Sequence, residues 1–326
     1  MKKVLITGIT GFAGPHLANL LAKDEDIAVY GLVRASNGRE NDIRDIVNDD
    51  VFSTINFVYA DLRDKGGVER VLRQVEPDEI YHLAAQSHPP TSFIEPYNTF
   101  MANAIGTANI VDYISNHLPE CKLMNCSTSE VYGSVPKEDG MIKETRPLAP
   151  INPYGVSKAA ADMYVRERAK SLNRPYFCTR AFSHTGPRRG NRFSLSSDAH
   201  QIARIKKDLQ EPIIHVGDLS SRRMVMDVRD CVRAYVMLMD KAECGEAYNV
   251  GGGTMDSIGG FLNAMLDMSY LSGRVEIMVD KALLRPIDIP IQRPDSRKLQ
   301  TLTGWKTEIS VEDMLYDLIE YWTNKI

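Results

Sequence analysis

A tyrosine and a lysine at helical spacing are the residues of this sequence best suited to proton transfer. Tyr154 and Lys158 lie in the segment Tyr-Gly-Val-Ser-Lys, and the preceding Asn152 and Pro153 can start a helix. On a helix, side chains four residues apart lie on one face. The lysine would favour the phenolate, lower the pKa of the phenol from about 10 and also hold a cofactor ribose. The alternative is an ordinary exposed pair, but a glycine-rich turn near the N-terminus favours the catalytic pair.

A second polar group, Ser127-Thr128-Ser129-Glu130, follows an apolar run that we predict to be a strand over 122–126. Ligands of open parallel sheets bind at the carboxyl ends of strands, so Thr128 and Glu130 should lie near them. Thr128 can hydrogen-bond a substrate oxygen shared with Tyr154, and Glu130 can remove a carbon-bound proton and return a proton elsewhere. Glu130 could instead cap a helix or lie on the surface, but we predict a catalytic role for both residues.

The glycine-rich segment at 8–14, Gly-Ile-Thr-Gly-Phe-Ala-Gly, directly follows a short apolar run and precedes a helix-like stretch. Glycines permit a tight turn and let a pyrophosphate approach the amides of a helix N-terminus, where the helix dipole also favours an anion. Alone, the pattern could be a structural turn, but its position between strand and helix predicts dinucleotide binding. The predicted contacts are Gly8, Thr10, Gly11, Phe12 and Gly14.

The end of the second predicted strand bears on the choice between NAD and NADP. An acidic residue there accepts from a ribose hydroxyl, whereas a 2′-phosphate requires positive charge. Arg34 occupies this position and Arg39 and Arg44 follow it, which favours NADP(H), although such an arginine can also be a solvated side chain. The ends of the third and fourth strands should contact the cofactor as well. The residues there are Asp61, Leu62, Leu83, Ala84, Ala85 and Ser87.

The elements that position these residues alternate between β-branched runs and helix-like stretches. Strands are expected at 4–6, 28–33, 56–59, 79–83, 122–126 and 247–250, and helices at 15–23, 68–75, 99–116, 157–171 and 228–239. This alternation predicts an α/β fold with a doubly wound parallel (Rossmann) sheet and a smaller C-terminal substrate-binding lobe. The NADP-binding domain should comprise 1–182 with return segments at about 222–252, and the second lobe 183–221 and 253–326. Apolar residues on one face of the last helix, from Val311 to Trp322, indicate a structural cover.

Composition restricts the classes of function. Across 326 residues, 39 Lys and Arg stand against 43 Asp and Glu, so no basic excess indicates nucleic-acid binding. The five cysteines show neither C-x-x-C pairing nor the spacing of a zinc site, which fits a reducing compartment and predicts no metal. No run of about eighteen apolar residues is present, so we expect a soluble, cytoplasmic protein without membrane contact.

Several ordered motifs resemble the extended short-chain dehydrogenase/reductase superfamily over essentially the whole chain. Within it, the motifs look like those of the GDP-mannose 4,6-dehydratase group, which includes GDP-manno-heptose 4,6-dehydratases. The matching segments are Thr-Gly-Ile-Thr-Gly at 7–11, Ala-Gln-Ser-His at 85–88, Ser-Thr-Ser-Glu-Val-Tyr-Gly at 127–133 and His-Thr-Gly-Pro-Arg-Arg-Gly at 184–190. The resemblance implies a tightly held NADP+ that takes hydride from sugar C4, loss of water across C5 and C6, and return of hydride to C6.

The same resemblance implies residue roles. Tyr154 would be the base for the C4 hydroxyl, Thr128 its partner on that oxygen, and Glu130 the acid/base at C5 and C6. The residues implied to touch the cofactor are Tyr154, Lys158, His184 and Arg189. Arg223 and Arg285 match positions that grip the nucleotide diphosphate, a task suited to a guanidinium group, and the predicted substrate contacts also include Ser87, Thr128 and Ser183.

Two departures leave alternatives open. Ser183 stands where the group usually has Asn, and the insertion typical of GDP-mannose dehydratases before the Arg-Pro motif is missing. The stretch 201–305 also looks like GDP-4-keto-6-deoxymannose reductases, which bind NADPH and donate hydride to C4. A non-catalytic NADP-sensing protein is an alternative of another class, because a fold does not determine a function. The superfamily commonly dimerises through two helices per subunit, here 99–116 and 157–171, which implies a homodimer or homotetramer.

Overall fold

The larger lobe is built on a parallel sheet. A computed structural model of the chain describes residues 1–34, 39–284 and 286–326. Within these residues the large sheet has seven strands in the order β10-β6-β5-β4-β1-β2-β3, and every neighbouring pair is parallel. The strands are β1 (Lys2–Thr7), β2 (Ile27–Val33), β3 (Asn56–Tyr59), β4 (Glu79–His82), β5 (Lys122–Thr128), β6 (Tyr176–Ala181) and β10 (Ala247–Val250). The chain first extends the sheet from β1 to β3 and then returns to place β4 on the other side of β1. A crevice for a ligand therefore opens beside the carboxyl ends of β1 and β4.

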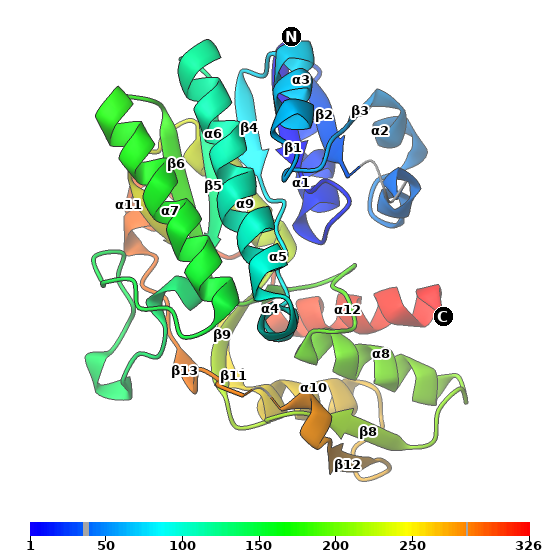
Figure 1. Cartoon of the computed structure of the whole chain (residues 1–326). Helices are drawn as coiled ribbons and strands as arrows, with labels where there is room; N and C mark the ends of the chain where they lie inside the picture. The colour runs from blue at the N-terminus through cyan, green and yellow to red at the C-terminus, as the bar shows by residue number, and fades with distance from the viewer. Residues whose placement is uncertain (35–38, 285) are drawn as a thin grey trace.

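Helices cover both faces of this sheet (Figure 1). On β1, Val4 and Ile6 point into one core and Leu5 into the other, as the two-residue period of a strand requires. The first core is covered by α1 (Ala13–Leu21) and α9 (Val228–Met239), and the second by α3 (Lys65–Val75), α6 (Gly106–His117) and α7 (Pro153–Leu172). Shorter segments of this lobe are η1 (Glu40–Asp45), α2 (Asp49–Thr54), α4 (Pro89–Ile94), α5 (Pro96–Phe100), η2 (Met101–Ile105), η3 (Ser129–Tyr132), η4 (Lys137–Asp139) and α11 (Arg297–Thr303).

The smaller lobe lies beyond the carboxyl ends of the large sheet (Figure 1). Its helices are α8 (Ser194–Lys206), η5 (Lys281–Leu283), α10 (Ile258–Met268) and α12 (Val311–Lys325). Its strands are β7 (His184–Thr185), β8 (Ile213–Val216), β9 (Arg222–Asp227), β11 (Thr254–Ser257), β12 (Glu276–Val279) and β13 (Ile291–Gln292). The faces of α8, α10 and α12 share one hydrophobic core, so the predicted packing role of the last helix is confirmed.

The predicted α/β fold is confirmed, and three boundaries differ from the sequence expectations. The helix predicted over 99–116 consists of α5, a π-helical turn at η2 and α6, because backbone geometry can change without altering the apolar pattern. The helix predicted from Ser157 starts at Pro153, where Asn152 caps it. β9 pairs with β11 and β13, so the return to the large sheet begins with α9 at Val228 and not near 222. With that change, the division into two domains remains our proposal.

Candidate active site

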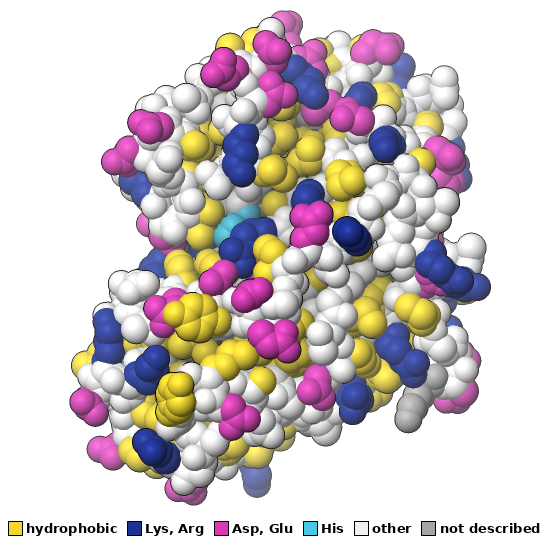
Figure 2. All heavy atoms as spheres, turned by 180° about the vertical axis from the view of Figure 1, so that it is seen from behind, with side chains coloured by type: hydrophobic (Ala, Val, Ile, Leu, Met, Phe, Trp, Pro, Cys, Tyr) yellow, Lys and Arg dark blue, Asp and Glu magenta, His cyan; other side chains and the backbone are white. Residues whose placement is uncertain are grey.

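A cleft of about 1420 Å³ lies between the two lobes, at the carboxyl ends of the large sheet. Figure 2 shows the narrowing between the lobes from behind, where basic, acidic and hydrophobic side chains lie together. The volume exceeds that of a pocket for one small ligand, which is usually below about 1,000 Å³. Every residue predicted to serve catalysis, the cofactor or the substrate lines this cleft, except Arg285, which lies outside the described residues.

The glycine-rich turn has the close packing that a phosphate-binding loop needs. Gly8 has φ of +74°, and a Cβ there would lie 2.8 Å from the backbone of Ala84 on the neighbouring loop. A Cβ on Gly14 would lie 2.5 Å from the carbonyl oxygen of Gly8. Arg188 donates to the carbonyl oxygens of Thr10 and Gly11, both at 3.0 Å. The Arg188 guanidinium therefore satisfies two carbonyl oxygens of the turn. The backbone amides at the start of α1 can then face an anion. Sequence reasoning did not assign Arg188 this role.

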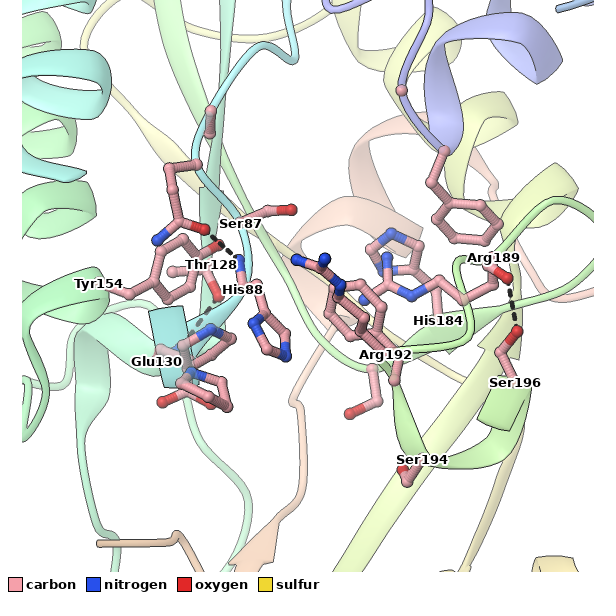
Figure 3. Close-up of a pocket in the computed structure, with 18 of the residues that line it drawn as sticks. Ser87, His88, Thr128, Glu130, Tyr154, His184, Arg189, Arg192, Ser194 and Ser196 are labelled. Carbon is pink, nitrogen blue, oxygen red and sulfur yellow. Dashed lines mark hydrogen bonds between the residues drawn. The ribbon is translucent and has the colours of Figure 1, made fainter. Parts of the chain in front are cut away.

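The candidate catalytic side chains of Thr128, Glu130 and Tyr154 lie together at the start of α7 (Figure 3). The side-chain oxygen Oδ1 of Asn152 accepts from the Gly155 backbone amide at 2.7 Å, and its Nδ2 donates to Glu130 Oε2 at 2.8 Å. The same side chain therefore caps the helix that bears Tyr154 and holds the Glu130 carboxylate. Gly155 permits this approach, because a Cβ there would lie 2.9 Å from the Glu130 carbonyl oxygen. From the sequence, Asn152 is expected only to start the helix.

The pKa of Tyr154 shifts in the direction opposite to the sequence expectation. Its side chain is 8% exposed, and burial raises the pKa of the phenol above its ordinary value of 10.0. A hydrogen bond with Thr128 and the charge of Arg189 act against that rise. Burial also lowers the pKa of Lys158, which is 2% exposed. The predicted lowering of the Tyr154 pKa is therefore wrong for the protein's own groups, because loss of hydration outweighs the nearby positive charge.

The π-helical turn η2 supports α7 from the side. Asn103 in this turn accepts from the Gln86 amide at 2.7 Å and donates to the Gln86 carbonyl oxygen at 3.0 Å. It also donates to Ser157 Oγ at 2.9 Å. Asn103 thereby ties the loop after β4, which carries Ser87, to the helix that carries Tyr154. The apolar pattern gave no signal for this residue, because the pattern is the same for an α-helical and a π-helical turn.

His184 and Arg189 form the opposite wall of the cleft (Figure 3). The His184 ring stacks on Phe12 at 5.7 Å, and its Nδ1 donates to the Phe182 carbonyl oxygen at 2.8 Å, which leaves Nε2 as an acceptor. Burial and the charge of Arg189 lower the pKa of His184 to about 4, so the ring is neutral at neutral pH. The Arg189 guanidinium lies over the rings of Phe12 and Phe193, at 4.7 and 3.4 Å.

Positive charge gathers at the ends of β2 and β3, where the sequence predicts selection of NADP. Arg34, Arg39 and Arg63 line the cleft together with Asp61. Asp61 is engaged by Arg63 through hydrogen bonds of 2.6 and 3.0 Å, which lower the pKa of its carboxyl group. Arg44 does not line the cleft, because it pairs with Asp49 and lies 3.7 Å over the ring of Phe52. Arg63, which was not predicted from the sequence, joins the arginines that line this part of the cleft.

A family model described as GDP-mannose 4,6 dehydratase matches residues 5–318. The chain belongs to this family. The dehydratase of this name from Vibrio cholerae is 30% identical over 352 residues, which covers 98% of the chain and 93% of the relative. GDP-6-deoxy-D-mannose reductase from Pseudomonas aeruginosa is 28% identical over 326 residues, which covers 100% of the chain and 98% of the relative. Both a lyase and a reductase are thus among the relatives of this GDP-mannose 4,6-dehydratase family member.

The solved structures support the same fold. RMD from Pseudomonas aeruginosa in complex with NADPH superposes with a TM-score of 0.83 at 26% sequence identity, over the full length of both chains. The predicted membership of the extended short-chain dehydrogenase/reductase superfamily is confirmed. Among the described residues of this family member, no helix has the length and apolar character needed to cross a bilayer.

The smaller lobe of this family member contains a buried acid that sequence reasoning missed. Asp198 on α8 is 3% exposed and lines the cleft, and its Oδ2 has no hydrogen-bond partner among the described residues. Burial alone raises the pKa of its carboxyl group from 3.8 to about 7. A buried carboxylate of this kind costs stability unless a partner supplies donors. An aspartate in an otherwise amphipathic helix carries no sequence signal for this state.

Asp198→Asn is expected to stabilise the protein at about pH 8 and to have little effect at about pH 4. Between pH values near 4 and 7 the unfolded chain has released this proton while the folded chain keeps it, so rising pH favours unfolding. Each pKa unit corresponds to about 1.4 kcal/mol, which makes the loss for wild type up to about 4 kcal/mol at pH 7 and above. Urea unfolding at both pH values measures the difference, with the exposed Glu211→Gln as the control. An equal difference at both pH values would contradict the expectation.

Proposed function

We propose that this protein is a GDP-sugar 4,6-dehydratase that converts GDP-mannose or GDP-D-glycero-D-manno-heptose into its 4-keto-6-deoxy derivative with NADP as cofactor. The observation that carries the proposal is the Glu130 carboxylate, which Asn152 holds at the start of the helix that bears Tyr154. Elimination of water needs an acid/base group for C5 and C6 in addition to the one for the C4 hydroxyl. Glu130 supplies the second group, and the family match supports the substrate class.

The residues of the cleft fit a dinucleotide. The backbone of the turn at Gly8 and Gly14 leaves no room for side chains, as a close-lying pyrophosphate requires. Arg34 and Arg63 provide positive charge at the strand ends for a ribose 2′-phosphate. The NADPH complex of the similar Pseudomonas aeruginosa protein supports the same cofactor class. A bound NADP+ would accept hydride from sugar C4 and return it to C6.

The protein's own groups would move the protons. Tyr154 takes the proton of the C4 hydroxyl, and Thr128, which hydrogen-bonds to the phenol, orients that oxygen. Glu130 removes the C5 proton and delivers a proton to the C6 hydroxyl, which leaves as water. Glu130 then takes up a proton from solvent and gives it to C5, while Tyr154 releases the C4 hydroxyl proton to solvent, so that the net change is the loss of one water. Asn152 keeps the carboxylate at the correct side of the helix start.

The second candidate is a GDP-4-keto-6-deoxymannose-type reductase. The relative from Pseudomonas aeruginosa with that kind of name matches the chain over its full length, which favours this alternative. In that reaction Tyr154 would donate a proton to the C4 oxygen of a keto sugar while NADPH is consumed. Glu130 would then have no proton to remove.

The deciding experiment offers the purified protein GDP-mannose and, separately, GDP-manno-heptose, with and without added NADP+, and follows mass spectra. We expect a product lighter by one water, with a solvent deuteron at C5 when the reaction runs in D2O. A parallel assay with a GDP-4-keto-6-deoxy sugar measures NADPH consumption. Consumption of NADPH without any loss of water in the first assay would move the assignment to the reductase. Failure of both assays would support the non-catalytic alternative.

Asn152→Ser is expected to lower kcat for water loss roughly tenfold while stability stays close to wild type. Serine can still cap α7, but it lacks the amide that donates to Glu130 Oε2. Asn152→Ala removes both interactions and should also cost about 1 kcal/mol of stability. Steady-state kinetics and thermal unfolding of the two variants separate these effects. Wild-type kcat in Asn152→Ser would show that Glu130 does not depend on this hydrogen bond.

We also propose that the smaller lobe binds the GDP-sugar and that two copies of the chain associate through α6 and α7. Exposed apolar side chains on and beside these helices support the second point, among them Phe100, Val156 and Met163. Such a patch is unfavourable in water unless a partner covers it. Sedimentation equilibrium of the purified chain should give a dimer or a tetramer, and a monomer would contradict this proposal.

A further inference from the structure

Asp198 lies in the wall of the cleft that the smaller lobe contributes. It stands in the second turn of α8, four residues after Ser194 and two after Ser196. Figure 3 shows these two serines across the cleft from Tyr154 and Glu130. Its side chain is 3% exposed, and Oδ2 has no hydrogen-bond partner among the residues that the structure describes. Buried polar atoms in folded proteins are almost always paired, so an unpaired acceptor at a ligand cleft indicates that a ligand supplies the donors.

Several apolar side chains line the part of the cleft that the smaller lobe contributes. Leu195, Val216, Val225 and Ile258 line the cleft and also belong to the hydrophobic core of the smaller lobe. Burial raises the pKa of the Asp198 carboxyl group, and Oδ2 has no hydrogen-bond partner among the described residues that would offset the loss of hydration. A carboxylate in the same cleft wall as these apolar side chains suits a flat ring that packs on the wall and presents N–H groups at its edge.

The neighbouring strand places this wall relative to the rest of a nucleotide sugar. Arg223 and Val225 lie two residues apart on β9, so their side chains share one face of the strand, and both line the cleft. Arg223 is paired with Asp288 at 3.3 Å and is the residue proposed to grip the diphosphate. The sugar must reach Tyr154 in the larger lobe, so the base extends from the diphosphate into the smaller lobe. The smaller-lobe part of the cleft, which Val225 and Asp198 both line, is where a base would lie.

We propose that Asp198 recognises the base of the substrate, with its carboxylate accepting hydrogen bonds from guanine N1–H and the guanine N2 amino group. Guanine presents two adjacent N–H donors, which match the two oxygens of a carboxylate. Uracil and thymine present one N–H between two carbonyl groups, and adenine presents an amino group beside a ring acceptor, so each would bring an acceptor against the carboxylate. This inference rests on the proposed function, because it assigns the base recognition of the same substrate site.

Binding of nucleoside diphosphates to the purified full-length protein tests the assignment. Isothermal titration at about pH 8 compares GDP, IDP, XDP and UDP. Wild type should bind GDP roughly tenfold more tightly than IDP, which lacks the N2 amino group, and more tightly still than XDP or UDP. In Asp198→Asn the amide oxygen can accept from xanthine N1–H while its NH2 donates to the xanthine C2 carbonyl. That variant should therefore prefer XDP over GDP by roughly tenfold.

The inversion of the GDP to XDP ratio is a readout that a purely structural role for Asp198 would not produce. Glu211→Gln, which removes an exposed carboxylate in the loop after α8, should keep the wild-type ratio. An unchanged ratio in Asp198→Asn, or equal binding of GDP and UDP by wild type, would overturn the assignment. Inversion of the ratio without loss of water from any GDP-sugar would support the assignment of Asp198 to base recognition and reject the proposed dehydratase activity. Loss of water with an unchanged ratio would reject the base recognition alone.

Discussion

Tyr154→Phe is expected to lower kcat for loss of water from a GDP-sugar by at least about a hundredfold, with cofactor binding close to wild type. A general acid/base typically contributes 10²–10⁴ to the rate, and phenylalanine keeps the ring while removing the proton-carrying oxygen. The phenol is hydrogen-bonded to Thr128 and lies within the influence of Arg189, so its loss leaves no other hydroxyl on α7 at the same place. Phe fits the space, so the helix should be unaffected.

Tyr164→Phe is the matched control for this experiment. Tyr164 lies on the same helix, but its hydroxyl donates to Asp112 and does not line the cleft. Steady-state rates and fluorescence titration with NADP+ should show near-normal turnover for Tyr164→Phe and normal cofactor affinity for both variants. Turnover of Tyr154→Phe within about tenfold of wild type would reject the role given to the phenol.

Arg180→Met is expected to destabilise the protein by about 3–5 kcal/mol, the largest stability effect that we predict. Arg180 and Asp162 are 1% and 0% exposed and form two hydrogen bonds of 2.9 and 3.0 Å. Arg180 also donates to Tyr132 Oη and to the Glu144 carbonyl oxygen, both at 3.0 Å. Removal of the guanidinium leaves the buried Asp162 carboxylate with only the more distant, partly exposed Arg166 at 3.7 Å, and this poorly compensated charge accounts for most of the loss.

An exposed ion pair provides the contrast. Arg146 and Asp139 are 30% and 40% exposed and lie 2.9 Å apart, so Arg146→Met should cost no more than about 1 kcal/mol. The double variant Asp162→Asn with Arg180→Met should recover part of the loss, because no uncompensated charge remains. Urea unfolding of the three variants measures the differences. A cost for Arg180→Met no larger than that for Arg146→Met would show that the buried pair is not the source of stability.

Local features of the chain were predictable because their physics acts over a few residues. The alternation of apolar runs predicts the strands of the large sheet except β6, since a buried strand needs an apolar face wherever it lies. Gly8 and Gly14 mark the turn after β1, because other residues would collide with the neighbouring backbone. Tyr154 and Lys158 share a face because α7 runs through both. Asn152, which is followed by a proline, marks the start of this helix because an Asn side chain can cap the first turn.

The sequence by itself therefore determined the α/β class, the glycine-rich turn after β1 and the identity of the candidate catalytic residues. Tertiary structure alone decided what surrounds them: the hydrogen bond from Asn152 to Glu130, the stacking of His184 on Phe12 and the unpaired carboxylate of Asp198. It also reversed the expected shift of the Tyr154 pKa. The reason is that the burial of a side chain and its hydrogen-bond partners depend on residues that are far apart in the sequence and close in space. Loss of hydration and nearby charges then act on the side chain through space and not along the chain.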